Sequence, residues 1–297
     1  MFWCIKPRSP LPGREIAGKG EESFILDLEE SPGGSAANTA VGLARLKVKT
    51  GFIGKVASDR EGEILLQSFR NENVDINGVI ISNKGRSGVV TGYVDKTGER
   101  TLYVDPGVND SLEFQEIARD YIRSAKFLHL TSFVGKKPFE AQKKLLENTR
   151  NVKISFDPGE IYVRKGLTAL RPLLKKSYVI FPNENEVKLL TKENHEKGSK
   201  FLIKEGVGLV AVKLGAKGCY VTDGHESYLI KPYKVRAVDS TGAGDAFCAG
   251  FLYGLSEHKD LYECGKLGNF VASRCIEKVG AREGCPYLSK LNAEKIV

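Results

Sequence analysis

The stretch "DSTGAGDAF" (239–247) places two carboxylates, Asp239 and Asp245, on either side of a glycine-rich turn. The apolar run "AFCAGFLYGL" overlaps its end and predicts that a buried helix begins at the turn. A glycine-rich turn that opens a helix usually binds an anion, because several backbone N–H groups lack a partner and the helix dipole adds positive potential. A carboxylate at the start of such a helix therefore needs a chemical explanation.

The composition narrows the class of protein. The chain has 297 residues and a net charge of +8, and its Lys and Arg residues are scattered rather than gathered in a stripe. This pattern argues against a nucleic-acid platform and suits anionic small molecules. The six cysteines show no C-x-x-C spacing, and neither a signal peptide nor a run of about 20 apolar residues is found. We expect a cytoplasmic protein with reduced thiols that binds neither nucleic acid nor a membrane.

Short apolar runs alternate with helical patterns through the middle and C-terminal parts of the chain. The expected strands are 126–130, 152–157, 177–182 and 208–214, and the expected helices are 137–149, 165–176, 185–190, 194–205, 243–256 and 260–277. This alternation predicts an α/β fold with a doubly wound, mostly parallel sheet flanked by helices. The segment 87–107 differs, because two alternating strands flank the turn "DKTGE". We expect this hairpin outside the main sheet, as a lid, an oligomer interface, or both.

The stretch "SPGGSAANTAVGLARL" (31–46) predicts a tight turn followed by a closely packed helix. Gly33 and Gly34 permit a close backbone approach, and Ser35 is expected to cap the helix. Asn38, one turn into the helix, either satisfies a buried backbone group or binds a polar ligand. A closely packed helix start with no ligand is the alternative interpretation.

Two further motifs follow expected strands. In "FPNENEVKLL" (181–190), Asn183 and Glu186 share one side of a first helical turn at the carboxyl end of a strand, where ligands collect in open α/β sheets. A carboxylate and an amide oxygen suit Mg²⁺ held largely through water, although this motif taken alone favours ordinary helix capping with acidic first-turn residues. In "VKLGAKGCYV" (212–221), Gly215 and Gly218 predict a tight connection, for which a plain hairpin is the alternative.

The three motifs "GGSAAN", "NENE" and "DSTGAGD", in this order, resemble the ribokinase-like (PfkB) family of carbohydrate and nucleoside kinases. The resemblance covers about residues 31–288, and the last motif is the most specific. It implies a ribokinase-like fold with a β-lid at about 87–107. It also implies an ATP-dependent phosphotransferase that acts on a hydroxyl of a sugar or nucleoside.

The resemblance implies that Asp245 is the general base that takes the proton from the acceptor hydroxyl. The N–H groups of Gly242, Ala243 and Gly244 are then the anion hole for the transferring phosphoryl group. This pairing explains a carboxylate at an anion-binding turn, because nucleophile and electrophile must meet there. The helix dipole is expected to keep Asp245 ionised.

The resemblance also implies roles for the other matched residues. The substrate-contacting turn matches Gly33, Gly34 and Asn38. The nucleotide-binding positions match Lys213, Gly215, Gly218 and Asn269. The Mg²⁺ motif matches Asn183 and Glu186, and a monovalent-cation loop, for an ion such as K⁺, matches Asp239 with the backbone around Cys275, Lys278 and Gly280.

The amino-terminal part departs from the family pattern, which begins with a strand that ends near a substrate-binding Asp. Residues 1–10, "MFWCIKPRSP", contain no Asp, and Pro7 and Pro10 remove backbone donors. We therefore separate an atypical segment, 1–30, from a kinase domain, 31–297, and expect 1–10 to be irregular rather than a core strand. We expect a longer form with an apolar strand and an Asp to be more stable and active, because unpaired ladder groups are costly when buried.

Other functions are weighed against the same residues. A catalytically silent sugar or nucleoside sensor on this fold is the alternative, which the intact motifs oppose and the missing strand favours. A dinucleotide-dependent oxidoreductase fails on position, because no G-x-G-x-x-G follows a first strand. Ser35 stands where ribokinase itself has Lys, which disfavours ribose. The hairpin at 87–107 favours a homodimer.

Overall fold

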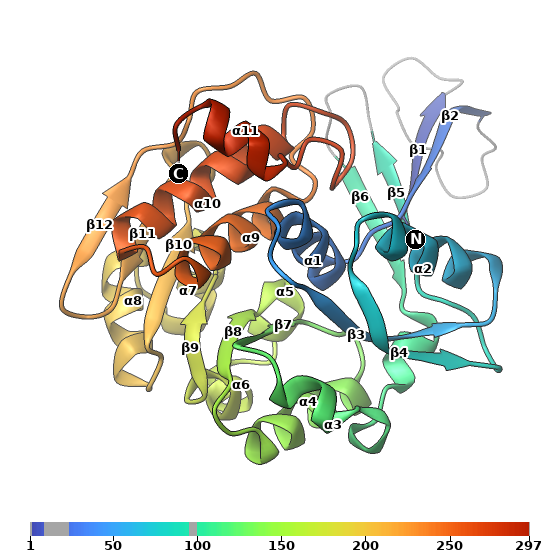
Figure 1. Ribbon diagram of the computed structural model, residues 1–297, viewed down its shortest axis with the longest axis horizontal. Helices are drawn as coiled ribbons and strands as arrows, with labels where there is room; N and C mark the ends of the chain where they lie inside the picture. The colour runs from blue at the N-terminus through green and yellow to red at the C-terminus, as the bar shows by residue number, and fades with distance from the viewer. Residues whose placement is uncertain (1, 9–23, 95–99, 297) are drawn as a thin grey trace.

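A six-stranded sheet forms the centre of the computed structural model, which describes residues 2–8, 24–94 and 100–296 (Figure 1). Its strand order is β12-β11-β10-β9-β8-β7. The parallel strands are β7 (Phe127–Thr131), β8 (Lys153–Asp157), β9 (Ser177–Ile180) and β10 (Leu209–Lys213). The antiparallel strands are β11 (Cys219–Thr222) and β12 (Ser227–Ile230). The predicted mostly parallel sheet is confirmed.

Helices cover both faces of this sheet, as the alternating pattern predicts. One face packs against α4 (Lys136–Asn148), α5 (Gly159–Val163), α6 (Leu167–Leu174), α7 (Glu184–Thr191) and α8 (His195–Lys204). The other face packs against α1 (Ser35–Arg45), α9 (Ala243–Ser256) and α10 (Leu261–Cys275), with α11 (Leu288–Ala293) against α10. The expected strands and helices of the middle and C-terminal parts match these bounds to within two residues.

A second, four-stranded sheet lies at one side of the molecule (Figure 1). Its order is β2-β1-β5-β6, with β1 (Phe2–Arg8), β2 (Phe24–Ser31), β5 (Val89–Val94) and β6 (Arg100–Asp105). Strands β5 and β6 pair antiparallel from Val89–Asp105 to Val94–Arg100, which confirms the predicted hairpin outside the main sheet. Its turn, 95–99, lies outside the described residues.

The prediction that residues 1–10 form no strand is wrong for residues 2–8. Strand β1 pairs antiparallel with β2 and parallel with β5, so it lies inside the small sheet. The pairing with β2 shifts register between Lys6 and Pro7. A bulge of this kind tolerates a proline, which cannot donate to a ladder. Pairing with β2 and β5 thus outweighs the effect of Pro7, which by itself argues against a strand. Residues 9 and 10 lie outside the described residues.

A third sheet contains only β3 (Gly51–Ala57) and β4 (Asp75–Ser82), which are parallel and joined by α2 (Arg60–Asn71). The single-turn helices η1 (Gly107–Ser111) and η2 (Phe114–Glu116) and the short helix α3 (Arg119–Arg123) then lead into β7. No helix of the described residues has both the length and the apolar character required to cross a membrane.

Candidate active site

The glycine-rich turn at 242–244 forms the start of α9, as the sequence predicts. Gly242 has a φ of +76°, and a Cβ there would lie 2.4 Å from the carbonyl oxygen of Ala281, so only glycine fits. The N–H of Ala243 makes a long bond of 3.3 Å to the carbonyl oxygen of Ser240. Within the described part of the chain, the N–H groups of Gly242 and Gly244 have no acceptor. Such N–H groups at the start of a 14-residue helix suit an anion.

Asp245 lies in the first turn of the same helix and is held by α1. Ser35 donates its hydroxyl to Oδ1 at 2.6 Å, and Asn38 donates its amide to Oδ2 at 2.7 Å. Burial raises the pKa of Asp245 to about 6, and the hydrogen bonds from Ser35 and Asn38 oppose that rise. A carboxylate with this pKa is mostly ionised at pH 7 and still able to accept a proton, as a general base requires.

The expectation that Ser35 caps α1 is wrong. Gly34, with a φ of +112°, is the capping residue, and Ser35 begins the helix with its hydroxyl directed to Asp245. Asn38 is likewise used within the protein, since its Oδ1 accepts a hydrogen bond of 2.8 Å from Nε of Arg282. Arg282 is 3% exposed and also reaches the carbonyl oxygen of Gly33 at 3.4 Å. The turn expected to contact substrate thus fixes the carboxylate of Asp245.

Lys213, at the end of β10, lies close to the same helix start. Its Nζ is 2.6 Å from Oδ2 of Asp157 and 3.3 Å from the point that a Cβ on Gly244 would occupy. Burial alone lowers the pKa of Lys213, but Asp157 outweighs burial and holds that pKa above its usual value. Cys248 donates its thiol to the same oxygen of Asp157 at 3.5 Å. A partly buried, charged ammonium group therefore lies beside the proposed anion hole.

Asn183 and Glu186 form a reciprocal cap at the start of α7. Oδ1 of Asn183 accepts from the N–H of Glu186 at 2.9 Å, and Oε2 of Glu186 accepts from the N–H of Asn183 at 2.8 Å. Burial raises the pKa of Glu186 above its usual value, although Lys213 acts against this. The capping interpretation is thus confirmed, and it uses Oε2 of Glu186 rather than Oε1.

Gly215 and Gly218 form the connection between β10 and β11, which is a hairpin, as the alternative interpretation held. A Cβ on Gly218 would lie 2.0 Å from the carbonyl oxygen of Ile230. Asn269, in α10, donates its amide to the carbonyl oxygens of Ile230 and Lys231 at 3.1 and 3.2 Å. Gly218 and Asn269 therefore meet at the end of β12, away from Asp245 along the sheet.

Asp239 ties the turn before α9 to the loop after α10. Its Oδ1 accepts from the N–H and hydroxyl of Thr241 at 2.9 and 2.6 Å, and its Oδ2 accepts from the N–H of Gly280 at 2.9 Å. The sequence elements of the expected cation loop are thus in contact. Among the described residues, no group of three or more His, Cys, Asp or Glu side chains forms a metal site.

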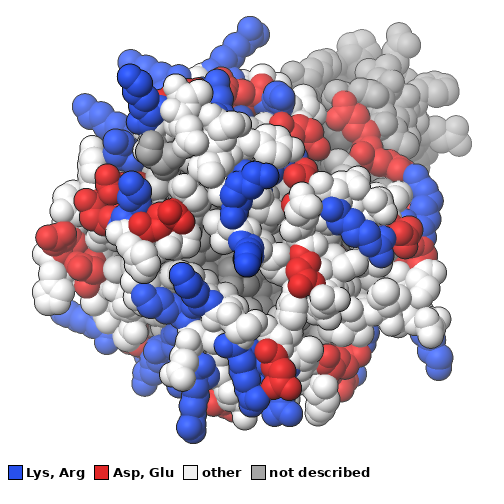
Figure 2. All heavy atoms as spheres, in the orientation of Figure 1, with Lys and Arg blue, Asp and Glu red and all other residues white. Residues whose placement is uncertain are grey.

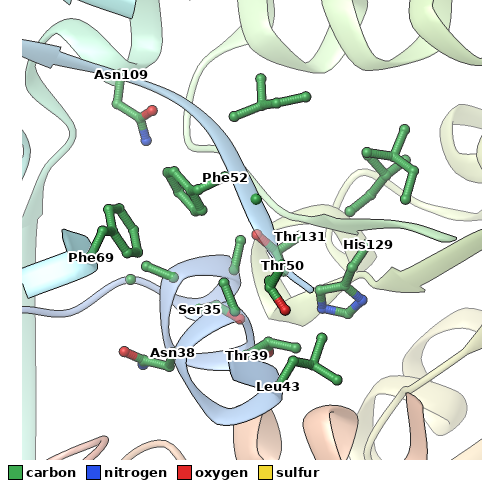
Figure 3. A pocket seen from close by; sticks show the side chains of 18 of the residues that line it. Ser35, Asn38, Thr39, Leu43, Thr50, Phe52, Phe69, Asn109, His129 and Thr131 are labelled. Atoms are coloured by element: carbon green, nitrogen blue, oxygen red, sulfur yellow. The ribbon is translucent and has the colours of Figure 1, made fainter. Parts of the chain in front are cut away.

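A cavity of about 1260 Å³ reaches the two residues that hold Asp245, Ser35 and Asn38 (Figure 3). Leu102 and Val104 of β6 line it, so the predicted lid faces the site. Asn109 also lines the cavity and gives it a polar group. Figure 2 shows Lys and Arg side chains on several sides of a central hollow in one face of the molecule, which suits an anionic ligand.

Sequence reasoning did not identify Asp157 and Arg282. Asp157 is the last residue of a correctly predicted strand, and a carboxylate at the carboxyl end of a parallel strand was an available signal. Arg282 lies in a loop without periodicity and meets Asn38 across 244 positions of sequence. No local pattern indicates that contact.

Comparisons with known proteins agree with this geometry. The model of the pfkB family carbohydrate kinases matches residues 16–287. An uncharacterized sugar kinase of Archaeoglobus fulgidus is 46% identical over 83% of this chain and 98% of its own length. An ATP-dependent ribose-1-phosphate kinase of Halopiger xanaduensis is 35% identical over 88% of this chain and 86% of its own.

The fold is also that of solved sugar kinases. The crystal structure of a ribokinase from Thermotoga maritima superposes with a TM-score of 0.87 at 26% identity, over 98% of this chain and 95% of that one. A glycine-rich helix start beside a carboxylate, on this fold, is the arrangement expected for phosphoryl transfer to a hydroxyl. The chain therefore belongs to the pfkB family of carbohydrate kinases and is a kinase that phosphorylates a sugar with ATP.

Proposed function

We propose that Asp245 is the general base of this kinase and that the start of α9 is its anion hole. The observation that carries the proposal is the placement of Asp245 three residues after Gly242, in a helix start whose N–H groups of Gly242 and Gly244 lack acceptors in the described part of the chain. Ser35 and Asn38 hold the carboxylate in a fixed orientation. Positioning and charge stabilisation supply most of the rate in phosphoryl transfer.

We further propose that Lys213 stabilises the charge on the transferring phosphoryl group. Its ammonium group is partly buried and paired with Asp157 at 2.6 Å, so it is held in place before a nucleotide binds. Lys213→Met is expected to lower kcat about 100-fold, the loss typical of a donor to a developing charge. Asp157→Asn, which keeps Lys213 but loosens it, is expected to lower kcat less. Equal kcat values in Lys213→Met and the wild type would remove this role.

The nucleotide and cation roles extend the same proposal. Gly215, Gly218 and Asn269 lie at the β10–β11 connection and the end of β12, where an adenosine group would be bound with its phosphates toward α9. Glu186 would hold Mg²⁺ through water, and the Asp239–Gly280 contact would hold the loop of a monovalent cation such as K⁺. Bound Mg²⁺ would neutralise negative charge on the phosphates of the nucleotide. The dependence of kcat on Mg²⁺ and K⁺ concentration tests these roles.

The acceptor is proposed to be a sugar or sugar phosphate, with a nucleoside as the alternative. The cavity beside Ser35 provides Asn109 for hydroxyl groups, and the basic surface around the hollow favours a phosphorylated acceptor (Figure 2). The relative from Halopiger xanaduensis supports the inclusion of ribose 1-phosphate. A screen of ribose, ribose 1-phosphate, fructose, ketohexose phosphates, adenosine, inosine and cytidine for ATP turnover tests this. Binding without turnover across the screen would instead support a sensor.

A homodimer through the small sheet is also proposed. The side chains of Leu102, Tyr103 and Val104 in β6 are 45–62% exposed. Consecutive residues of a strand point to opposite faces, and large apolar side chains exposed on both faces of one strand are unusual in a monomer. Sedimentation equilibrium of the wild type and of Tyr103→Lys tests the interface. A wild-type chain that stays monomeric at micromolar concentration would contradict it.

A further inference from the structure

Arg282 is a buried, charged side chain to which the proposed reaction assigns no role. It is 3% exposed and is not among the residues that line the cavity. In the described part of the chain its guanidinium donates to three neutral oxygens: Oδ1 of Asn38 at 2.8 Å, Oγ of Ser68 at 3.0 Å and the carbonyl oxygen of Gly33 at 3.4 Å. A charge buried among neutral acceptors is costly. A neutral amide could donate to the same oxygens, so the positive charge needs an explanation.

The loop that contains Arg282 contacts three parts of the candidate site through three successive residues. The contacts are those of Gly280 with Asp239, of Ala281 with Gly242, and of Arg282 with Asn38. Figure 3 shows Asn38 on α1, one turn beyond Ser35. The loop thus places the guanidinium next to the side chain that holds Asp245.

A guanidinium fixes the orientation of the Asn38 amide because it can only donate hydrogen bonds. It must therefore meet the amide oxygen, Oδ1, and this leaves the amide nitrogen, Nδ2, to donate to Oδ2 of Asp245 at 2.7 Å. The opposite orientation would place two donors together at Arg282 and two acceptors together at Asp245. A residue that can also accept, such as glutamine, would permit both orientations of the amide.

The positive charge of Arg282 also faces the carboxylate of Asp245 across one amide. Burial lowers the pKa of Arg282 to about 10, so the side chain stays charged at pH 7. Three carboxylates act against that lowering: Glu283, Asp245 and Glu72. Glu283 is exposed and Glu72 pairs with Arg45 at 2.5 Å, which leaves Asp245 as the carboxylate within the site. A cation near a carboxylate favours its ionised form.

We propose that Arg282 is a positioning residue for the base of this kinase. It holds the amide of Asn38 in the orientation that donates to Asp245, and its charge keeps Asp245 ionised. This inference rests on the proposed role of Asp245 as the base. Because Arg282 lies outside the cavity, it contacts neither the acceptor nor the nucleotide. Its loss is therefore expected to change the rate and its pH dependence rather than the binding of ATP.

The test compares two substitutions of Arg282. Arg282→Gln removes the charge but can still donate to the buried oxygens, so the fold is expected to be kept, whereas Arg282→Lys keeps a charged group that can only donate. Arg274→Gln is the matched control. The guanidinium of Arg274 also lies over a phenylalanine ring, at 5.0 Å against 5.8 Å for Arg282, but its acceptors are Glu277 and Glu294.

Other titratable groups also face Asp245 and bear on the pH dependence. They are Lys213, Asp157, Cys248 and Cys275. Lys213 and Asp157 are paired with each other at 2.6 Å. Burial raises the pKa of the Cys248 thiol, and a hydrogen bond with Cys285 raises the pKa of the Cys275 thiol, so both thiols are neutral near pH 6. A change in the pH profile near pH 6 therefore reports the ionisation of Asp245.

Arg282→Gln is expected to lower kcat about tenfold, because a small misplacement of a reacting group is costly. It is also expected to raise the apparent pKa of kcat/KM by about one unit, through loss of a nearby positive charge, and to leave KM for ATP unchanged. Arg282→Lys is expected to keep the apparent pKa near 6 and to recover most of kcat. Arg274→Gln is expected to keep the wild-type apparent pKa. An unchanged kcat and apparent pKa in Arg282→Gln would overturn the proposal, as would equal shifts of the apparent pKa in the Gln and Lys variants.

Melting temperatures separate this proposal from that of the base itself. Arg282→Gln is combined with Asp245→Asn, and the single and double variants are melted at pH 7 and pH 4. The charge of Arg282 stabilises only an ionised Asp245, so Arg282→Gln is expected to cost more at pH 7 in the chain with Asp245 than in Asp245→Asn. At pH 4, where Asp245 is protonated, the two losses are expected to be equal. Equal losses at pH 7 would refute the contact whatever the kinetics show. A wild-type kcat in Asp245→Asn would refute the base, whereas an inactive Asp245→Asn beside a fully active Arg282→Gln would refute the role of Arg282 alone.

Discussion

The substitution Asp245→Asn separates the proposed catalytic role of this carboxylate from its structural role. Asparagine fits the same site, with its oxygen toward Nδ2 of Asn38 and its amide nitrogen toward the hydroxyl of Ser35, which can accept as well as donate. The fold is therefore expected to remain intact. Loss of a general base is expected to lower kcat by about 10²–10⁴.

The same substitution is expected to increase stability. The pKa of Asp245 lies at about 6 in the folded chain, against an ordinary value of 3.8. A carboxylate with a raised folded pKa destabilises the fold when ionised, and this cost grows as pH rises from 3.8 to 6 and is then constant. The difference corresponds to about 3 kcal/mol at pH 7. Asp245→Asn removes that charge, so its melting temperature is expected to exceed that of the wild type by several degrees at pH 7 and not at pH 4.

Steady-state kinetics and thermal melts at several pH values test both expectations. Wild-type kcat/KM is expected to fall about tenfold per pH unit below an apparent pKa near 6, and the residual activity of Asp245→Asn is expected to lose that dependence. Asp260→Asn is the matched control, because Asp260 caps α10 far from the site and asparagine caps equally well. A kcat in Asp245→Asn equal to that of the wild type would refute the role of Asp245.

Three further predictions concern the neighbouring groups. Glu186→Gln is expected to raise the Mg²⁺ concentration for half-maximal rate without affecting sugar binding in the absence of nucleotide; an unchanged Mg²⁺ dependence would leave Glu186 with its capping role alone. Gly242→Ala places a Cβ 2.4 Å from the carbonyl oxygen of Ala281 and is expected to lower kcat at least tenfold. Gly166→Ala is the control for backbone strain, because Gly166 has a similar positive φ of +82° but open space around it, and this variant is expected to keep the wild-type kcat. Asn269→Ala leaves the carbonyl oxygens of Ile230 and Lys231 without the Asn269 amide as a donor. This variant is expected to lower the free energy of unfolding by about 1–3 kcal/mol and to raise KM for ATP. An unchanged KM for ATP would confine Asn269 to a structural role.

Most of the fold could be predicted from the sequence because its strands are buried on both faces. Continuous apolar runs such as 208–214 identify such strands directly, and the helices between them carry regular apolar faces. The amino-terminal strand β1 escaped this reasoning, because Pro7 argues against a strand unless its pairing is known. The register shift beside Pro7 is set by β2, so no local pattern reveals it.

The individual residues of the candidate site could be predicted from the sequence, but the hydrogen bonds between them could not. Motif spacing identified Asp245, Asn38 and Glu186, each from its own stretch of sequence. It could not show that Asn38 binds Asp245, because the two are 207 positions apart. It could not choose between capping and Mg²⁺ binding for Glu186 either, since one oxygen caps the helix and the other remains available.

The contacts of Asn38 change where substrate specificity must be sought. Both ends of its amide are engaged by the protein, Nδ2 with Asp245 and Oδ1 with Arg282. Because Arg282 stays charged, with burial lowering its pKa only to about 10, the amide is held in one orientation. We therefore expect the amino-terminal glycine motif to act mainly by orienting the proposed base, which any acceptor hydroxyl requires. Discrimination among sugars is then expected to depend on other residues that line the cavity, such as Asn109, Leu102 and Val104, which lie outside the three motifs that identify the family.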